Sequence, residues 1–277
     1  MPNPAMADQE PELIVTVKDK VCILRFNRPH IKNCFSREMM TEISLALEEA
    51  ASDPDILILV MTGTGDYFTS GMQLQDTRAG QSSMTSMDTE TDVEQKLSNA
   101  IHSIRNTFHR FVLSLIDFPK PLIAVVNGHA VGIGVTMLGL CDIVYASDKA
   151  TFQTPFVKLG LAPEGCSTYT FPQIMGPGKA AEMIFFGKKV DAAQACQSRL
   201  VTDVFPDTCP DQVWSQIYEW AQLPPSTLTS AKGMLKTTKK DILCKVNTME
   251  CDHLVERIQD GEFFAAMMKF FSQKSKL

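Results

Sequence analysis

The stretch PLIAVVNGHAVGIGVTMLGLCDIVYAS, residues 121–147, contains two strand-like runs separated by a glycine-rich segment. The first run is apolar and ends at Val126, and the pattern after it predicts a helix that begins near Gly132. Such a helix start leaves backbone N–H groups unpaired at the positive end of the helix dipole. The stretch therefore predicts an α/β fold with a turn that can bind a negatively charged atom.

A second glycine turn lies upstream in GDYFTSGMQL, residues 65–74, where a strand ends and the chain turns at Gly71. Two turns whose N–H groups converge on one point form an oxyanion hole. Each motif is weak alone, since YFTSG is also typical of an ordinary strand exit. A Rossmann cofactor site is disfavoured, because GIG lacks the third glycine of the dinucleotide fingerprint.

Strand-like and helix-like patterns alternate along the rest of the chain. Strands are expected at residues 12–17 and 21–27, which form a hairpin, and at 56–63, 121–128, 141–147 and 200–205. A helix is expected over residues 36–51 with Ser36 as its N-cap. A long amphipathic helix is marked by Leu97, Ile101, Ile104, Phe108, Phe111 and Leu115. This alternation predicts an α/β fold.

The domain organisation follows from where the alternation begins and ends. Residues 1–11 are rich in proline and predict a flexible lead-in, and residues 12–200 form the α/β core. Residues 201–274 form a mainly helical C-terminal region without an independent second domain. The polar residues 77–94, rich in Ser and Thr, predict a mobile loop inside the core.

Composition excludes several classes of function. The 277 residues carry a net charge of -6 and no long basic run, so binding to nucleic acid has little support. No apolar run is long enough for a membrane span, and the N-terminus is unlike a signal peptide. The 8 cysteines include no Cys-x-x-Cys pair and the 5 histidines form no cluster, so neither a metal site nor disulfides are expected.

A single acid stands in GLAPEGCSTYT, residues 160–170, where Glu164 is the only charged residue between Lys158 and Lys179. Pro-Glu-Gly is ordinary turn chemistry, and taken alone it favours a solvent-exposed turn. The competing hypothesis is a general base. Cys166 is a weaker candidate as a nucleophile, because no histidine lies near it in the sequence to activate it.

Four ordered motifs resemble the crotonase, or enoyl-CoA hydratase/isomerase, superfamily. They are residues 23–43 (ILRFNRPHIKNCFSREMMTEI), 67–74 (YFTSGMQL), 121–147 and 150–176 (ATFQTPFVKLGLAPEGCSTYTFPQIMG). The resemblance implies a crotonase-like spiral of ββα units, with C-terminal helices that assemble homotrimers or dimers of trimers. It also implies an acyl-CoA thioester substrate whose thioester oxygen is held by the backbone N–H groups of Met72 and Ile133.

The acids distinguish the reactions of this superfamily. Hydratases use two glutamates, which the motif alignment places at Thr136 and Phe156, and neither residue can move a proton. Glu164 matches the single acid of the peroxisomal Δ3,Δ2-enoyl-CoA isomerases. One carboxylate is enough for that reaction, because the proton taken from C2 can be returned to C4. The resemblance therefore implies an isomerase of unsaturated fatty acid β-oxidation that needs no metal or other cofactor.

The same resemblance suggests substrate contacts at Ser70, Gly71, Gly132, Phe156, Leu161 and Lys32. An apolar acyl pocket beside Phe156, Leu159, Leu161 and Phe171 is expected to raise the pKa of Glu164. Lys32 is a candidate partner for a CoA phosphate, with a solvated surface lysine as the equal alternative. Gln73 stands where many relatives have Asp, so any role of that acid is lost or altered.

The sequence finishes in Ser275, Lys276 and Leu277, the tripeptide that peroxisomal import receptors read. The expectation is a location in the peroxisomal matrix and an import receptor as a partner. Two alternatives to the isomerase remain open. One is another acyl-CoA enzyme of the superfamily with weak hydratase activity, and the other is a catalytically silent acyl-CoA-binding scaffold.

Overall fold

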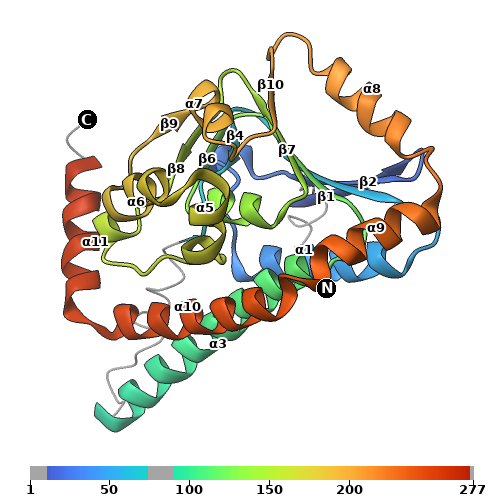
Figure 1. The fold of residues 1–277 in the computed structure, drawn as a ribbon. Coiled ribbons are helices and arrows are strands. Elements are labelled where there is room, and N and C mark those ends of the chain that lie inside the picture. The colour runs from blue at the N-terminus through green and yellow to red at the C-terminus, as the bar shows by residue number, and fades with distance from the viewer. Residues whose placement is uncertain (1–10, 74–89, 275–277) are drawn as a thin grey trace, which may run out of the picture.

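The computed structural model describes residues 11–73 and 90–274 and contains two β-sheets enclosed by helices (Figure 1). The strands of the six-stranded sheet, in spatial order, are β1 (Leu13–Lys18), β2 (Val21–Phe26), β3 (Ile58–Gly63), β5 (Leu122–Val126), β7 (Ile143–Ser147) and β10 (Asp203–Phe205). Those of the four-stranded sheet are β4 (Tyr67–Thr69), β6 (His129–Val131), β8 (Thr151–Gln153) and β9 (Val190–Asp191).

The larger sheet is mainly parallel. β1 and β2 form the expected antiparallel hairpin at its edge, and β2, β3, β5, β7 and β10 then pair in parallel. Every residue of β3 and β5 is buried, as expected for parallel strands covered on both faces. The apolar runs at residues 56–63 and 121–128 thus form the centre of the sheet.

From β3 to β8, successive strands alternate between the two sheets. β3, β5 and β7 lie in the larger sheet, and the strand that follows each of them, β4, β6 or β8, lies in the smaller one. A helix then returns the chain to the larger sheet after β4 and after β6. The chain is therefore wound as a spiral of ββα units, which confirms the crotonase-like fold.

The helices are α1 (Arg37–Ser52), α3 (Glu90–Asp117), α4 (Ile133–Thr136), α5 (Ser167–Met175), α6 (Pro177–Phe186), α7 (Ala192–Gln197), α8 (Asp211–Trp220), α9 (Pro225–Thr237), α10 (Lys240–Gln259) and α11 (Gly261–Lys274). In the part of the chain that the structure describes, short 3-10 helices occur at Pro29–Ile31 (η2), Met137–Leu140 (η4) and Val157–Leu159 (η5). The Ser36 side chain accepts a hydrogen bond from the Met39 N–H, so the predicted N-cap is confirmed.

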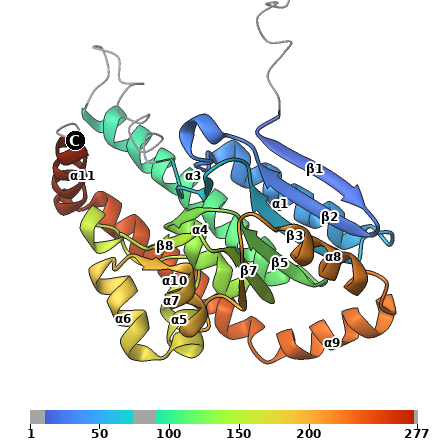
Figure 2. The same ribbon diagram turned by 90° about the horizontal axis from the view of Figure 1, so that it is seen from above.

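The C-terminal helices contact the core at several places, and α11 packs against η5. α10 packs along α3 and touches α5, whereas α8 and α9 lie at the opposite end of the molecule from α11 (Figures 1 and 2). On α3, Ile101, Ile104, Phe108, Phe111 and Leu115 are buried, as their spacing predicts. No helix among the described residues is both long enough and apolar enough to cross a membrane.

One boundary predicted from the sequence is wrong. The loop expected at residues 77–94 overlaps α3, which begins at Glu90. A run rich in Ser and Thr has little intrinsic helix preference, but α3 gains its stability from packing against α1 and α10. The rest of that loop, the lead-in except Pro11, and the C-terminal tripeptide lie outside the described residues. The division of the chain at residue 200 stays a prediction.

Candidate active site

The two glycine turns meet. Gly71 has φ +89° and Gly132 has φ +58°, conformations that residues with a side chain rarely adopt. A Cβ atom added at Gly71 would lie 2.8 Å from the carbonyl oxygen of Val131 and 3.7 Å from the Cα of Gly132. Glycine at position 71 therefore allows the backbones of the two turns to pack directly against each other.

Each turn presents an N–H group without an acceptor among the described residues. Phe35 donates to the Gly71 carbonyl at 2.8 Å and accepts from the Gln73 N–H at 2.9 Å, which leaves the Met72 N–H between them unpaired. Ile133 is the first residue of α4, whose hydrogen bonds to Gly132 come from later N–H groups. The two turns that pack against each other thus each carry an unpaired N–H group, and the one on Ile133 lies at the start of a short helix.

Glu164 lies next to these turns. It follows η5 and precedes α5, and only 6% of its surface is exposed. A Cβ atom at Gly132 would lie 4.0 Å from Glu164 Oε1, so the carboxylate borders the second glycine turn. A Cβ atom at Gly165 would lie 2.4 Å from Thr136 Oγ1, so the Glu164 turn packs tightly on α4. The exposed-turn interpretation of Glu164 is therefore wrong, because the fold buries the carboxylate.

The environment of Glu164 changes its acidity. Burial removes water from the carboxylate and, together with the nearby charge of Glu250, raises the pKa of Glu164 to about 8. An acid with this pKa is a stronger base than an ordinary glutamate and still ionises near neutral pH. The site therefore combines a buried carboxyl group of raised pKa with unpaired N–H groups on the adjacent turns.

Sequence reasoning missed Glu250 on α10, which is 2% exposed. Its carboxylate accepts hydrogen bonds from the Cys166 N–H at 2.6 Å, the Thr168 N–H at 2.9 Å and the Thr168 hydroxyl at 2.6 Å. Cys166 is the N-cap of α5 and Thr168 lies in its first turn, so these donors follow Glu164 closely in the sequence. One signal was present in the sequence: Glu250 shares a helical stripe with the apolar residues Leu254 and Ile258.

The other residues predicted to contact the substrate differ in how far their side chains are exposed to solvent. Phe156, Leu159 and Phe171 are buried, whereas Leu161 is partly buried and packs against an apolar cluster formed by α3, α10 and α11. Lys32 is exposed, with its Nζ 5.2 Å from the centre of the Tyr67 ring.

The Lys32 loop is tied to the first glycine turn. The carbonyl of Lys32 accepts a hydrogen bond from the Ser70 N–H at 2.9 Å, so Lys32 lies directly beside the turn at Ser70 and Gly71. The hydroxyl of Thr69 accepts from the Gly71 N–H at 3.0 Å and donates to the Asn33 carbonyl at 2.7 Å, which holds the turn in place.

The surroundings of Cys166 and Asp142 do not favour a catalytic role for either side chain. The Cys166 thiol is buried, and burial raises its pKa, so it is not an activated thiolate. Asp142 accepts from the Leu122 N–H at 2.8 Å and pairs with Lys232 at 2.6 Å, which is a structural arrangement. Within residues 11–73 and 90–274, no three His, Cys, Asp or Glu side chains gather as metal ligands.

The comparisons with known proteins agree with this geometry. The enoyl-CoA hydratase/isomerase family model matches residues 16–276. An enoyl-CoA hydratase/isomerase from Pseudoalteromonas atlantica T6c has the same fold, with a TM-score of 0.81, 29% identity and coverage of 95% of this chain and 98% of its own. The chain therefore belongs to the enoyl-CoA hydratase/isomerase family.

Two relatives are similar over nearly the whole chain. Human enoyl-CoA delta isomerase 2 is 48% identical over 96% of this chain and 64% of its own length. Mouse enoyl-CoA delta isomerase 3, peroxisomal, is 41% identical over 98% of this chain and 81% of its own. This chain thus spans less than two thirds of the human relative.

Proposed function

We propose that this protein shifts the double bond of 3-enoyl-CoA thioesters to give trans-2-enoyl-CoA, in the oxidation of unsaturated fatty acids. The observation that carries the proposal is the buried Glu164 carboxylate beside the Gly132 turn, where the Ile133 N–H begins α4. The names of the human and mouse relatives support the same reaction.

The reaction uses one base and one oxyanion hole. The Glu164 carboxylate takes a proton from C2, and the electron pair of that C–H bond moves toward the thioester oxygen to give a dienolate. The N–H groups of Met72 and Ile133 stabilise the negative oxygen. Glu164 then returns the proton to C4, and the double bond forms between C2 and C3. Protons and electrons balance within the substrate and Glu164, so the step requires no metal or redox cofactor.

Hydration of a 2-enoyl thioester is less well supported. The two positions at which hydratases carry glutamates hold Thr136 and Phe156, and both are buried. Thr136 lies against Gly165, which leaves little space for a longer side chain at that position. Neither residue can activate water, so an isomerase is the better interpretation of the site.

Three of the proposed substrate contacts belong to the two turns, and the others lie elsewhere in the fold. Ser70, Gly71 and Gly132 line the thioester, Phe156 and Leu161 the acyl chain, and Lys32 a phosphate of CoA. The exposed position of Lys32 beside the Ser70 turn supports its role. With Gln73 in place of an acid, the first turn adds no negative side-chain charge near the dienolate.

The function is tested with 3-hexenoyl-CoA and 3-decenoyl-CoA and without a coupling dehydrogenase. Conjugation of the double bond with the thioester increases the ultraviolet absorbance, so isomerisation is followed directly. We expect the absorbance to increase with both substrates or with one of them. Binding of the thioester without any increase would support the silent scaffold. In a parallel assay, consumption of 2-enoyl-CoA without any isomerisation of 3-enoyl-CoA would support a hydratase.

The pKa of Glu164 predicts the pH dependence of the reaction. A general base acts in its deprotonated form, so kcat/KM increases as the pH rises through the pKa of the free enzyme. We therefore expect the acidic limb of the kcat/KM profile near pH 8, because the pKa of Glu164 is about 8. A limb near pH 4, at roughly the pKa of an ordinary glutamate, would contradict this assignment.

Assembly and location extend the proposal. Exposed apolar side chains on α6 and α9, including Phe186 and Leu235, support a homotrimer or a dimer of trimers. Light scattering is expected to give the mass of three or six chains, and a monomer would contradict it.

The name of the mouse relative supports a peroxisomal location and an import receptor as a partner. Imaging a tagged protein with and without Leu277 tests this.

A further inference from the structure

Glu250 is a buried carboxylate that the proposed reaction does not use. It lies on α10, which Figure 1 shows below α5 and which contacts that helix. We propose that Glu250 is a positioning residue: by holding the first N–H groups of α5, it fixes the turn that places the Glu164 carboxylate beside the oxyanion hole. This inference rests on the proposed function.

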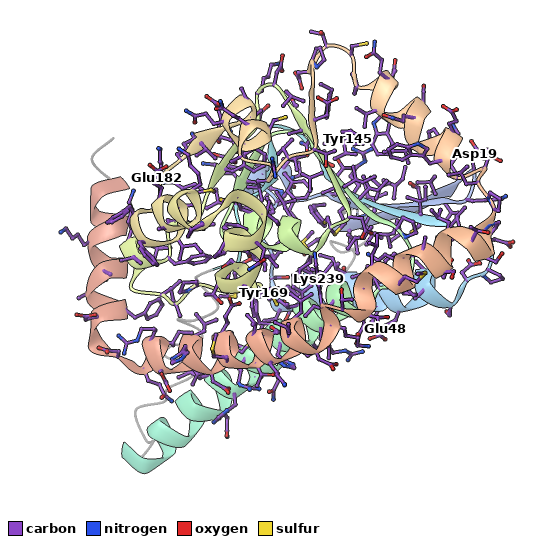
Figure 3. The ribbon with its side chains drawn as sticks, in the orientation of Figure 1. Asp19, Glu48, Tyr145, Tyr169, Glu182 and Lys239 are labelled. Carbon is purple, nitrogen blue, oxygen red and sulfur yellow. The ribbon has the colours of Figure 1, made fainter. Side chains whose placement is uncertain are left out.

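The start of α5 has no cap of its own. Its N-cap residue is Cys166, in the left-handed conformation with φ +61°, and the side chain of Cys166 makes no capping hydrogen bond. Glu250 replaces the missing cap from another helix, since its two carboxylate oxygens accept from Cys166 and Thr168. A negative charge at a helix N-terminus is also stabilised by the helix dipole. Figure 3 shows Tyr169 of α5 in the space between α5 and α10.

The held turn and Glu164 are one short piece of chain. Glu164 and Cys166 are separated only by Gly165, and the Glu164 carbonyl accepts from the Ser167 N–H at 3.2 Å. Gly165 lies directly against Thr136 of α4, so the turn is fixed between α4 and α10. Release of the Cys166 N–H from Glu250 therefore moves the base relative to the Ile133 N–H.

Glu250 also acts on Glu164 through its charge. Burial raises the pKa of Glu250, whereas the donors on Cys166 and Thr168 stabilise its ionised form and oppose that rise. The ionised Glu250 in turn raises the pKa of Glu164. Among the described residues, the other titratable and charged groups around the pair are Cys166 on the turn, Cys244 and Cys251 on α10, and Arg105 and Asp252 where α3 meets α10.

Glutamine at position 250 separates the positioning role from a general structural role. Its amide keeps the shape of Glu250 but replaces one carboxylate oxygen with an NH2 donor, and Cys166 and Thr168 donate to different oxygens of Glu250, so one of the two contacts loses its acceptor. We expect Glu250→Gln to lower kcat by about 10- to 100-fold, the size expected for a misplaced catalytic group, with KM largely kept. The acidic limb of kcat/KM is expected to move to lower pH, because Glu164 loses a negative neighbour.

Two further variants keep the test decisive. Glu256→Gln removes an exposed carboxylate from the same helix, paired with His253, and is expected to leave kcat and the limb unchanged. Thr168→Val removes one hydroxyl donor but keeps the charge of Glu250, so we expect a smaller loss of kcat and no shift to lower pH. If Glu250→Gln fails to fold, unchanged kcat in Thr168→Val overturns the proposal.

The outcome for Glu250 is distinguishable from the outcome for the proposed function. Absence of isomerase activity in the wild-type protein contradicts the function. An active wild type with unchanged kcat and pH limb in Glu250→Gln contradicts the positioning role alone. A loss of kcat with an unmoved limb, together with less folded protein by circular dichroism, means that Glu250 only supports the fold, and it also overturns the proposal.

Discussion

Replacement of Glu164 by glutamine lowers kcat by roughly 10²- to 10⁴-fold, the usual contribution of a general base. Glutamine keeps the size and the hydrogen-bonding capacity of the side chain but cannot take a proton from C2. Acyl-CoA binding is expected to persist, because the Met72 and Ile133 N–H groups belong to the backbone. Steady-state kinetics with 3-hexenoyl-CoA and equilibrium binding of a saturated acyl-CoA measure the two effects separately.

Stability provides the control for Glu164→Gln. Folding raises the pKa of Glu164 from 4.5 to about 8, so its contribution to stability is full below pH 4.5 and is lost as the pH rises through 8. Glutamine does not titrate, so the variant gains stability relative to the wild type between these pH values. A difference in Tm that grows from pH 5 to pH 8.5 is expected. Full turnover in the variant would mean that another acid performs the proton transfer.

The second large effect is expected for Gly71→Ala, which lowers kcat by about 10²- to 10³-fold, the loss found when one oxyanion-hole donor is removed. The added methyl group would lie 2.8 Å from the Val131 carbonyl oxygen, and φ is +89°. The first turn must therefore move, and the Met72 N–H moves with it. Steady-state kinetics measure the loss of kcat, and circular dichroism measures the folded fraction of the variant for which the rate is corrected.

Gly178→Ala is the matched control. A Cβ atom at Gly178 meets no other atom within 4 Å, and this residue lies in α6. Alanine is the better helix former, so this variant is expected to keep both stability and activity. If Gly71→Ala were as active as Gly178→Ala, the first turn would not contribute a donor to the oxyanion hole.

Local patterns in the sequence predicted much of this architecture. The apolar runs before Gly63 and at Val126 became buried parallel strands, because their hydrophobicity is continuous and does not alternate. Ser36 is the N-cap, and α4 begins at Ile133 directly after Gly132. Each of these features depends on neighbouring residues, which is why the sequence alone was enough.

Features that depend on residues far apart in the chain were not predictable in the same way. The contact of Gly71 with Val131 and the bond from Cys166 to Glu250 join segments that the spiral brings together. The two-residue strand β9 has too little pattern to be recognised and exists because it pairs with β8. The burial of Glu164 is similar, since Pro-Glu-Gly alone predicts an exposed turn.

The central claim is that one buried carboxylate carries a proton from C2 to C4. The direct measurement uses 3-enoyl-CoA in which deuterium replaces both hydrogens at C2, and the reaction is run in ordinary water. The amount and the position of deuterium are then determined in the earliest product. Because Glu164 is only 6% exposed, its deuteron exchanges slowly with water, and we expect a share of the product to carry deuterium at C4. A first product that carries no deuterium at C4 would contradict transfer by a single shielded base.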